Sequence, residues 1–275
     1  NAIRLLSNKD DYQFNIIVAP GLTYANTTTQ LDSIVSLAES RGDCIAVIDL
    51  VNYGSTLAGA TTKALSLNTS YGASYWPWVQ MRSATGRNEW CPASVVIPGV
   101  YAFTDAAAAP WFAPAGLVRG GIPGVIQTER RLSKSDRDNL YAGKVNPIAT
   151  FPGTGISIMG QKTLQSKASA LDRVNVRRLL IDLKKFIGDQ ARTLVFEQNT
   201  ISTRNKFLAA VNPYLESVVQ RQGLYAYRVV MDDTNNTADV VDRNQLIGQI
   251  YIQPAKTIEF VVLDFVIEPT GVTFG

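Results

Sequence analysis

Apolar and polar positions in the first third of the chain follow two different periods. Residues 14–19 and 44–50 form short apolar runs, and the first run stops at Pro20. Residues 29–41 and 56–67 instead place apolar side chains three or four positions apart, which is the spacing of one helix face. The order strand, helix, strand, helix predicts an α/β layer that contains a parallel pair of strands.

Residues 71–128 keep neither period for long. Aromatic residues and prolines crowd this stretch: Tyr71, Tyr75, Trp76, Pro77, Trp78, Trp90, Pro92, Pro98, Tyr101, Pro110, Trp111, Phe112, Pro114 and Pro123. Because disordered segments are poor in aromatic residues, we expect ordered and packed loops here. Two short elements are predicted within the stretch, a strand over 93–97 and a helix near 100–109.

Helical periodicity returns after residue 161. One predicted helix ends at Gly188, and its apolar face holds Leu171, Val174, Leu179, Leu180, Leu183 and Ile187. Its opposite face holds five cations: Arg173, Arg177, Arg178, Lys184 and Lys185. A second helix is predicted over 203–222, and Pro213 inside it predicts a kink or a split, since proline removes a backbone hydrogen bond.

The five cations of the first helix have three interpretations. They form the ordinary solvated side of an amphipathic helix, or they contact an acidic protein surface. Nucleic acid is disfavoured because no aromatic residues interleave the cations for stacking. The net charge of +3 is also too small to indicate a nucleic-acid partner.

The end of the chain is strand-like. Apolar runs cover residues 224–231, 246–252 and 256–267, and a polar loop over 232–244 separates the first two. Together with the first third, these runs predict an α/β (α+β) fold in which helices flank a mixed sheet.

Composition narrows the class of protein. Apolar residues make up 46% of the 275, enough for a sizeable core, and no stretch is long and apolar enough to predict insertion into a membrane. The chain begins at Asn1 without the basic start and apolar run of a signal peptide, so we expect a fragment or a processed form.

The absence of histidine argues against an enzyme. It excludes Ser-His-Asp and Cys-His nucleophilic sites and zinc sites built on imidazole. Two cysteines make no disulfide framework, and Cys44 opens an apolar run in which it is expected to be a small buried hydrophobe. No catalytic, cofactor-binding or metal-ligating residue is therefore predicted.

Other candidate motifs are weak. Gly153-Thr154-Gly155 lacks the third glycine of a dinucleotide fingerprint and is better interpreted as a turn. The loop over 232–244 is rich in oxygen ligands but lacks the central glycine and final glutamate of an EF-hand. A solvated hairpin connection is favoured there, and calcium bound between subunits stays open as an alternative.

Several short motifs, in order along the chain, carry a family resemblance. They are Ser74-Tyr75-Trp76-Pro77-Trp78, Gly99-Val100-Tyr101-Ala102-Phe103-Thr104-Asp105, Ala113-Pro114-Ala115-Gly116, Val145-Asn146-Pro147-Ile148, Gly160-Gln161-Lys162-Thr163-Leu164, Val174-Asn175-Val176-Arg177-Arg178-Leu179, Phe196-Glu197-Gln198-Asn199 and Pro254-Ala255-Lys256-Thr257-Ile258-Glu259-Phe260. The chain resembles the C-terminal part of contractile bacteriophage tail sheath proteins, most closely those of T4-like phages. Gln198 stands where the family usually has proline.

The resemblance implies a structural protein that acts through copies of itself. Sheath subunits stack as six-fold rings around a tail tube, between a baseplate and a tail terminator, and contract without ATP or a cofactor. It implies a virion component assembled in the host cytoplasm. Alternatives are the sheath of a related injection system, of bacteriocin or secretion type, and an α/β enzyme without histidine chemistry.

The resemblance also suggests a division of the chain. Residues 1–128 form an α/β part of the sheath core, 129–267 the C-terminal sheath domain, and 268–275 an arm that adds a strand to a neighbouring subunit. Residues up to 267 are expected in the subunit's own sheet. The inter-subunit arm residues are Glu259, Phe260, Val262, Phe265, Ile267, Val272 and Phe274, and the five helix cations are candidates to contact the tube or a neighbour.

Overall fold

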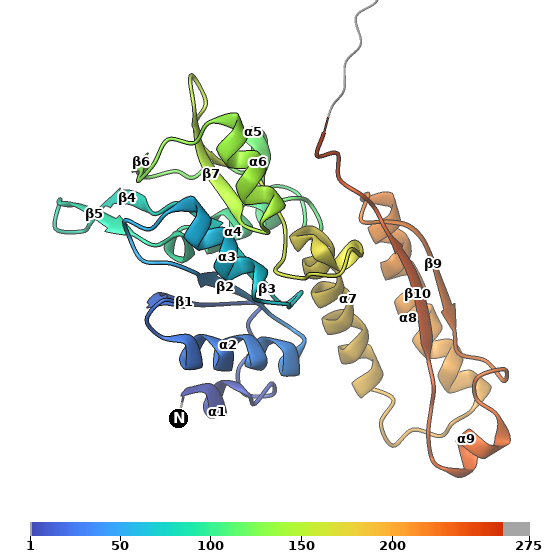
Figure 1. Cartoon of the computed structure of the whole chain (residues 1–275). Helices are drawn as coiled ribbons and strands as arrows, with labels where there is room; N and C mark the ends of the chain where they lie inside the picture. The colour runs from blue at the N-terminus through green and yellow to red at the C-terminus, as the bar shows by residue number, and fades with distance from the viewer. Residues whose placement is uncertain (1, 261–275) are drawn as a thin grey trace, which may run out of the picture.

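The chain folds around a five-stranded mixed sheet with strand order β1-β2-β3-β7-β8 (Figure 1). A computed structural model describes residues 2–260. The strands are β1 Ile16–Thr23, β2 Ile45–Asp49, β3 Gly72–Trp76, β7 Asn146–Phe151 and β8 Gly155–Ile158. The first four are parallel and β8 returns antiparallel along β7. The predicted parallel pair and the mixed α/β class are confirmed.

Helices cover both faces of this sheet. Cores on the two sides contain alternate residues of β2: Ala46 and Ile48 pack on one side, Ile45 and Val47 on the other. The first side is covered by α2 Thr28–Arg41, α3 Leu57–Leu65 and α6 Lys134–Ala142, and the second by α4 Ile97–Ala107 and α7 Val174–Arg192. Cys44 is fully buried in the first core, as predicted.

One predicted boundary and one predicted strand near prolines are wrong. β1 does not stop at Pro20 but continues to Thr23 through an irregularity in its pairing with β2. An edge strand tolerates proline, because the missing N–H faces away from the ladder. Residues 93–97 form no strand: the 3-10 helix η1 Ala93–Val95 leads directly into α4. Pro98 fits there because the first turn of a helix needs no N–H donor.

The stretch 71–128 contains more regular structure than predicted. It supplies the central strand β3 and a three-stranded sheet of β4 Val79–Arg82, β5 Asn88–Cys91 and β6 Val125–Thr128, in the order β5-β4-β6. The strands are short, and although β5 pairs with its neighbour β4, β3 and β6 pair with strands that lie far away in sequence. Their pairing, and not a periodic pattern, defines them.

The C-terminal part packs as a third core on the outer side of α7 (Figure 1). It consists of α8 Ile201–Gln220 and the antiparallel hairpin of β9 Leu224–Val230 and β10 Gln249–Pro254. One prediction fails here, because α7 continues past Gly188 to Arg192. Of the two outcomes predicted at Pro213, the split does not occur, since α8 continues through the proline as one helix. Buried Val211, Leu215 and Val218 hold α8 against the core on both sides of the proline.

Short helices complete the described part: α1 Ala2–Leu6, α5 Gly116–Arg119, η2 Ala170–Asp172 and α9 Ala238–Asp242. Residues 256–260 form no strand, so that part of the predicted third run is wrong. Val262, Phe265, Ile267, Val272 and Phe274 lie outside the described residues, as does the predicted arm over 268–275.

Candidate interaction surfaces

Two of the five predicted surface cations are buried. Arg177 and Arg178 are each 4% exposed. The Nη2 of Arg178 donates to the carboxylate of Asp105 at 2.5 and 2.7 Å. Arg177 donates to the carbonyl of Ser70 at 3.2 Å, and its guanidinium lies 3.9 Å from the ring centre of Tyr71. The prediction of a single solvated basic face is therefore wrong, because the sheet covers one side of the first half of α7 and the third core covers another.

Arg173 forms an ion pair with residues 255–260, which we call the C-terminal segment. Its Nε lies 2.6 Å from Glu259 Oε1, and its Nη2 lies 2.9 Å from Oε2, so the pair is bidentate. Gln161 Nε2 donates to Thr257 Oγ1 at 2.5 Å and to Glu259 Oε1 at 3.2 Å. We call Gln161, Arg173, Thr257 and Glu259 the latch. It fixes residues 257–259 to the start of α7.

The chemistry of the latch keeps Glu259 ionised. Burial alone would raise the pKa of Glu259, but hydrogen bonds from Arg173, Tyr141 and Gln161 lower that pKa below its usual value. A groove of about 800 Å³ lies beside the latch, between the C-terminal segment and the body. Ile258 and Phe260 line it and stay mostly exposed.

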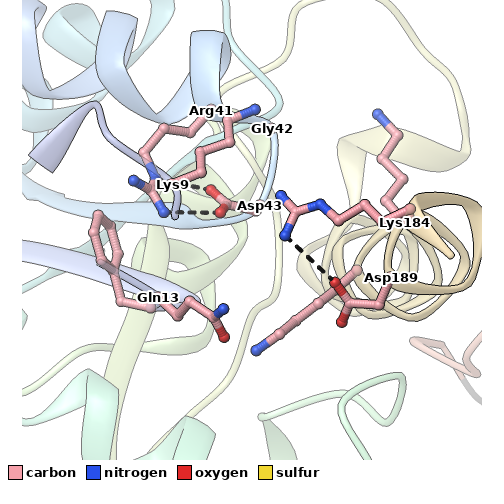
Figure 2. A pocket seen from close by; sticks show the side chains of 11 residues that line it. Lys9, Gln13, Arg41, Gly42, Asp43, Lys184 and Asp189 are labelled. Carbon is pink, nitrogen blue, oxygen red and sulfur yellow. Dashed lines mark hydrogen bonds and ion pairs between the residues drawn. The ribbon is translucent and has the colours of Figure 1, made fainter. Parts of the chain in front are cut away.

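Lys184 and Lys185, the other two predicted cations, are exposed and line a cleft of about 290 Å³ (Figure 2). We call it the basic cleft; its lining residues are Lys9, Gln13, Phe14, Arg41, Gly42, Asp43, Lys184, Lys185, Gly188, Asp189 and Arg192. In Figure 2, Lys9, Gln13, Arg41 and Asp43 lie on one side, and Lys184 and Asp189 on α7 lie on the other. The cleft thus joins segments that are far apart in the sequence, which no local pattern could predict.

Cations outnumber anions in the cleft by five to two. Asp43 neutralises Arg41 through bonds of 2.8 and 2.9 Å, and the same guanidinium also donates to the carbonyl of Tyr12. Arg192 lies 3.2 Å from Asp10 and 4.0 Å from Asp189. Within residues 2–260, Lys9, Lys184 and Lys185 form no ion pair. Three uncompensated ammonium groups make the cleft suited to an anionic partner.

The polar connection between β9 and β10 is a compact acidic loop. Asn236, buried at its base, donates to the carbonyls of Asp232 and Ile247 and accepts from the N–H of Ile247. The exposed acids of this loop, which we call the acidic loop, are Asp232, Asp233, Asp239 and Asp242. Asp233 pairs with Arg204 at 2.6 Å. The described residues contain no cluster of three or more side chains placed to ligate a metal, so nothing here adds support for the calcium alternative.

The glycine motif is a turn, as predicted. Gly153 and Gly155 have φ of 80° and 83° and connect β7 to β8. In the part of the chain that is described, no helix combines the length and the apolar character needed to cross a bilayer.

Comparison with known proteins identifies relatives over nearly the whole chain. Residues 1–164 match the phage tail sheath protein central domain, and residues 166–268 match the phage tail sheath C-terminal domain. The tail sheath protein of Vibrio phage KVP40 is 34% identical over 297 residues, covering 98% of this chain and 44% of that protein. The tail sheath protein of Enterobacteria phage T4 is 34% identical over 276 residues, covering 92% and 41%. The chain thus spans less than half the length of either relative.

Solved structures share the fold. The sheath complex of an extracellular contractile injection system, PVC, in its contracted state has a TM-score of 0.81 and 26% identity, covering 96% of this chain and 74% of that one. The contracted helical sheath of the anti-feeding prophage (AFP) has a TM-score of 0.76 at 22% identity, covering 96% and 73%, and supports the fold alone.

Proposed function

The chain belongs to the phage tail sheath family, and from that membership we propose that it is a structural subunit of a contractile tail sheath. Subunits of this kind would polymerise as six-fold rings around a tail tube and contract to drive the tube through the host envelope. The observation that carries the proposal is the match, over 96% of the chain, to a sheath solved in its contracted state.

The proposed partners follow from this role. They are further copies of the chain, the tube protein, and the baseplate and tail terminator proteins. We propose neither nucleic-acid binding nor membrane insertion, and no catalysis. The chain would be a component of the virion, assembled in the host cytoplasm. Contraction would be a rearrangement between two arrangements of the same subunits that differ in free energy.

The hairpin of β9 and β10 supports strand exchange between subunits. Within residues 2–260 each of these strands pairs only with the other, so the outer edge of each has unpaired backbone groups. Exposed edges of this kind are templates for another strand. A strand added from a neighbouring copy would satisfy those groups through main-chain hydrogen bonds. We therefore retain the division into 1–128, 129–267 and a C-terminal arm over 268–275 as part of the proposal.

A second candidate function is the sheath of a related injection system. The TM-score of 0.81 with the PVC sheath favours it. The two functions differ in cargo: a phage tail carries a head with packaged DNA, whereas a bacteriocin or secretion-type particle has no genome. Nuclease-protected DNA that copurifies with the particles would therefore indicate the phage function.

Electron microscopy of particles that contain this chain tests the proposal. We expect cross-striated tubes of stacked rings with six subunits each, in a long and a short form of different diameter. Mass spectrometry of the same fraction would confirm that the chain forms the outer layer. Particles with another symmetry, or a chain that stays monomeric in the mature particle, would contradict the sheath function.

A further inference from the structure

The basic cleft and the acidic loop lie on different sides of the molecule. The cleft lies between the N-terminal segments near α1 and α2 and the second half of α7. The acidic loop contains α9 and lies at the far end of the hairpin, on the outer side of α8 (Figure 1). The third core separates the two. Within one subunit the loop therefore does not reach the cleft.

Both features have charges without partners. In the cleft, Lys184 and Lys185 are exposed and form no ion pair within residues 2–260. In the loop, Asp239 and Asp242 are exposed and equally unpaired within that part of the chain. Hydrogen bonds from Thr234 lower the pKa of Asp232 in the same loop. Complementary charges on two different surfaces of a subunit suit a head-to-tail contact.

We infer that the acidic loop of one subunit docks into the basic cleft of a second copy of this chain. The inference rests on the proposed sheath function and names the residues of one of its interfaces. A volume of about 290 Å³ equals the share of about ten water molecules in liquid water, so the cleft has room for carboxylate side chains with bridging water. Because a head-to-tail contact uses two different surfaces, it can repeat around a ring or along a helix.

The contact is electrostatic and largely solvent-exposed. Its strength should therefore fall as salt rises, since charges more than about 8–10 Å apart are screened at 0.1–0.15 M salt. Other partners for the cleft are an acidic surface of the tube or a nucleic acid. These give different results when the charges of the cleft and of the loop are exchanged.

Charge reversal tests the pairing in full-length protein assembled into sheaths. We expect Lys184→Glu with Lys185→Glu, and separately Asp239→Lys with Asp242→Lys, each to lower the yield of sheath at least about ten-fold, which corresponds to about 1.4 kcal/mol. Lys134→Glu with Lys167→Glu makes the same change in net charge at exposed sites outside the cleft and should leave the yield unchanged. Thermal melts of all variants would show whether they fold.

Mixing the two reversed proteins makes the decisive measurement. The cleft that carries K184E and K185E should accept the loop that carries D239K and D242K, and the unmodified cleft of the second protein should accept the unmodified loop of the first. The two proteins then alternate around a six-membered ring, so co-expression should restore the yield although neither protein assembles alone. Each protein in the mixture has only two substitutions, so the rescue does not require one chain that combines all four.

Lack of rescue on mixing would overturn the inference, as would normal assembly of either reversed variant. If the cleft variant assembled with itself but no longer held the tube, the anionic partner would be the tube. Loss of nuclease-protected DNA from otherwise normal sheaths would indicate nucleic acid. In all these cases unmodified protein still forms striated tubes. Failure of the unmodified protein to form tubes would instead reject the sheath function.

Discussion

The bidentate pair between Arg173 and Glu259 should hold the C-terminal segment against the start of α7. The two side chains are 26% and 17% exposed. Exposed pairs contribute about 0.2–1 kcal/mol, and breaking a buried pair costs about 3–5 kcal/mol. For this half-buried, bidentate geometry we expect a coupling free energy of about 2 kcal/mol in a double-mutant cycle of Arg173→Ala and Glu259→Ala. Opening of the segment would then become about 30-fold more frequent when the pair is lost.

Hydrogen exchange reports that opening directly. The amide of Ala255 donates to the carbonyl of Gly223 at 3.1 Å, so its exchange rate measures whether the segment stays in place. Arg173→Lys tests the geometry: it keeps the charge but loses the planar fork, and should lose much of the protection. The matched control is the exposed pair of Arg192 with Asp10, whose side chains are 60% and 79% exposed. Arg192→Ala should leave Ala255 unaffected.

The pH dependence has a defined sign. The pKa of Glu259 is lowered from 4.5 in the folded state, so its contribution is complete above pH 4.5 and is lost as pH falls through the folded-state pKa. Protection at Ala255 should therefore decline in acid in the unmodified protein but not in Glu259→Gln, which is already weakened. A coupling free energy below about 1 kcal/mol, within the range of exposed pairs, would show that packing and not the latch holds the segment.

Three further predictions concern the body and the C-terminus. Gly223→Ala should destabilise the folded chain by about 1–3 kcal/mol in urea titrations, because the added Cβ would lie 2.6 Å from Val218 Cγ1 and 3.0 Å from Trp111. As its control, Gly188→Ala in α7 adds a Cβ that meets no atom within 4 Å, and it should stabilise the folded chain by about 0.5–1 kcal/mol. Burial raises the pKa of Asp49 from 3.8 to about 6, so stability should fall by about 2–3 kcal/mol as pH rises from about 4 to about 6; if Asp49→Asn shows the same slope in denaturation at a series of pH values, another group is responsible. Deletion of residues 268–275 should leave a folded chain that no longer builds long sheaths, and sheaths of normal length in electron micrographs would reject strand exchange through that segment.

Local patterns predicted the elements whose residues and end signals lie within one short stretch of sequence. The helix over 29–41, for example, needs only its own periodicity and a residue that ends it. Gly42 adopts the left-handed conformation at that end, with φ of 68°, and α2 is observed as Thr28–Arg41. The apolar run at 44–50 contains the interior strand β2, because a parallel strand buried on both faces is apolar at nearly every position; Asp49 at its end is the exception.

The same reasoning failed where distant residues decide. Ser94 donates through its N–H and its hydroxyl to the carboxylate of Asp49, at 3.1 and 2.5 Å, and this contact sets η1 where the sequence predicted a strand. Asp49 is 45 positions away along the chain, so no window of sequence contains both partners. The central strand β3 was missed for a similar reason: residues 72–74 are small and pair with β2 without an apolar pattern of their own.

The sequence by itself determined the net charge and the apolar content, the periodic helices, the buried strand at 44–50 and the family resemblance. It placed five cations on one helix, but a helix that is covered on more than one side has no single solvent face. Only tertiary structure decided that Arg177 and Arg178 are buried, that Arg173 holds the C-terminal segment, and that Lys184 and Lys185 face a cleft with Lys9. The physical reason is that burial and charge pairing depend on which distant segments fold against a helix, and a local period carries no information about those segments.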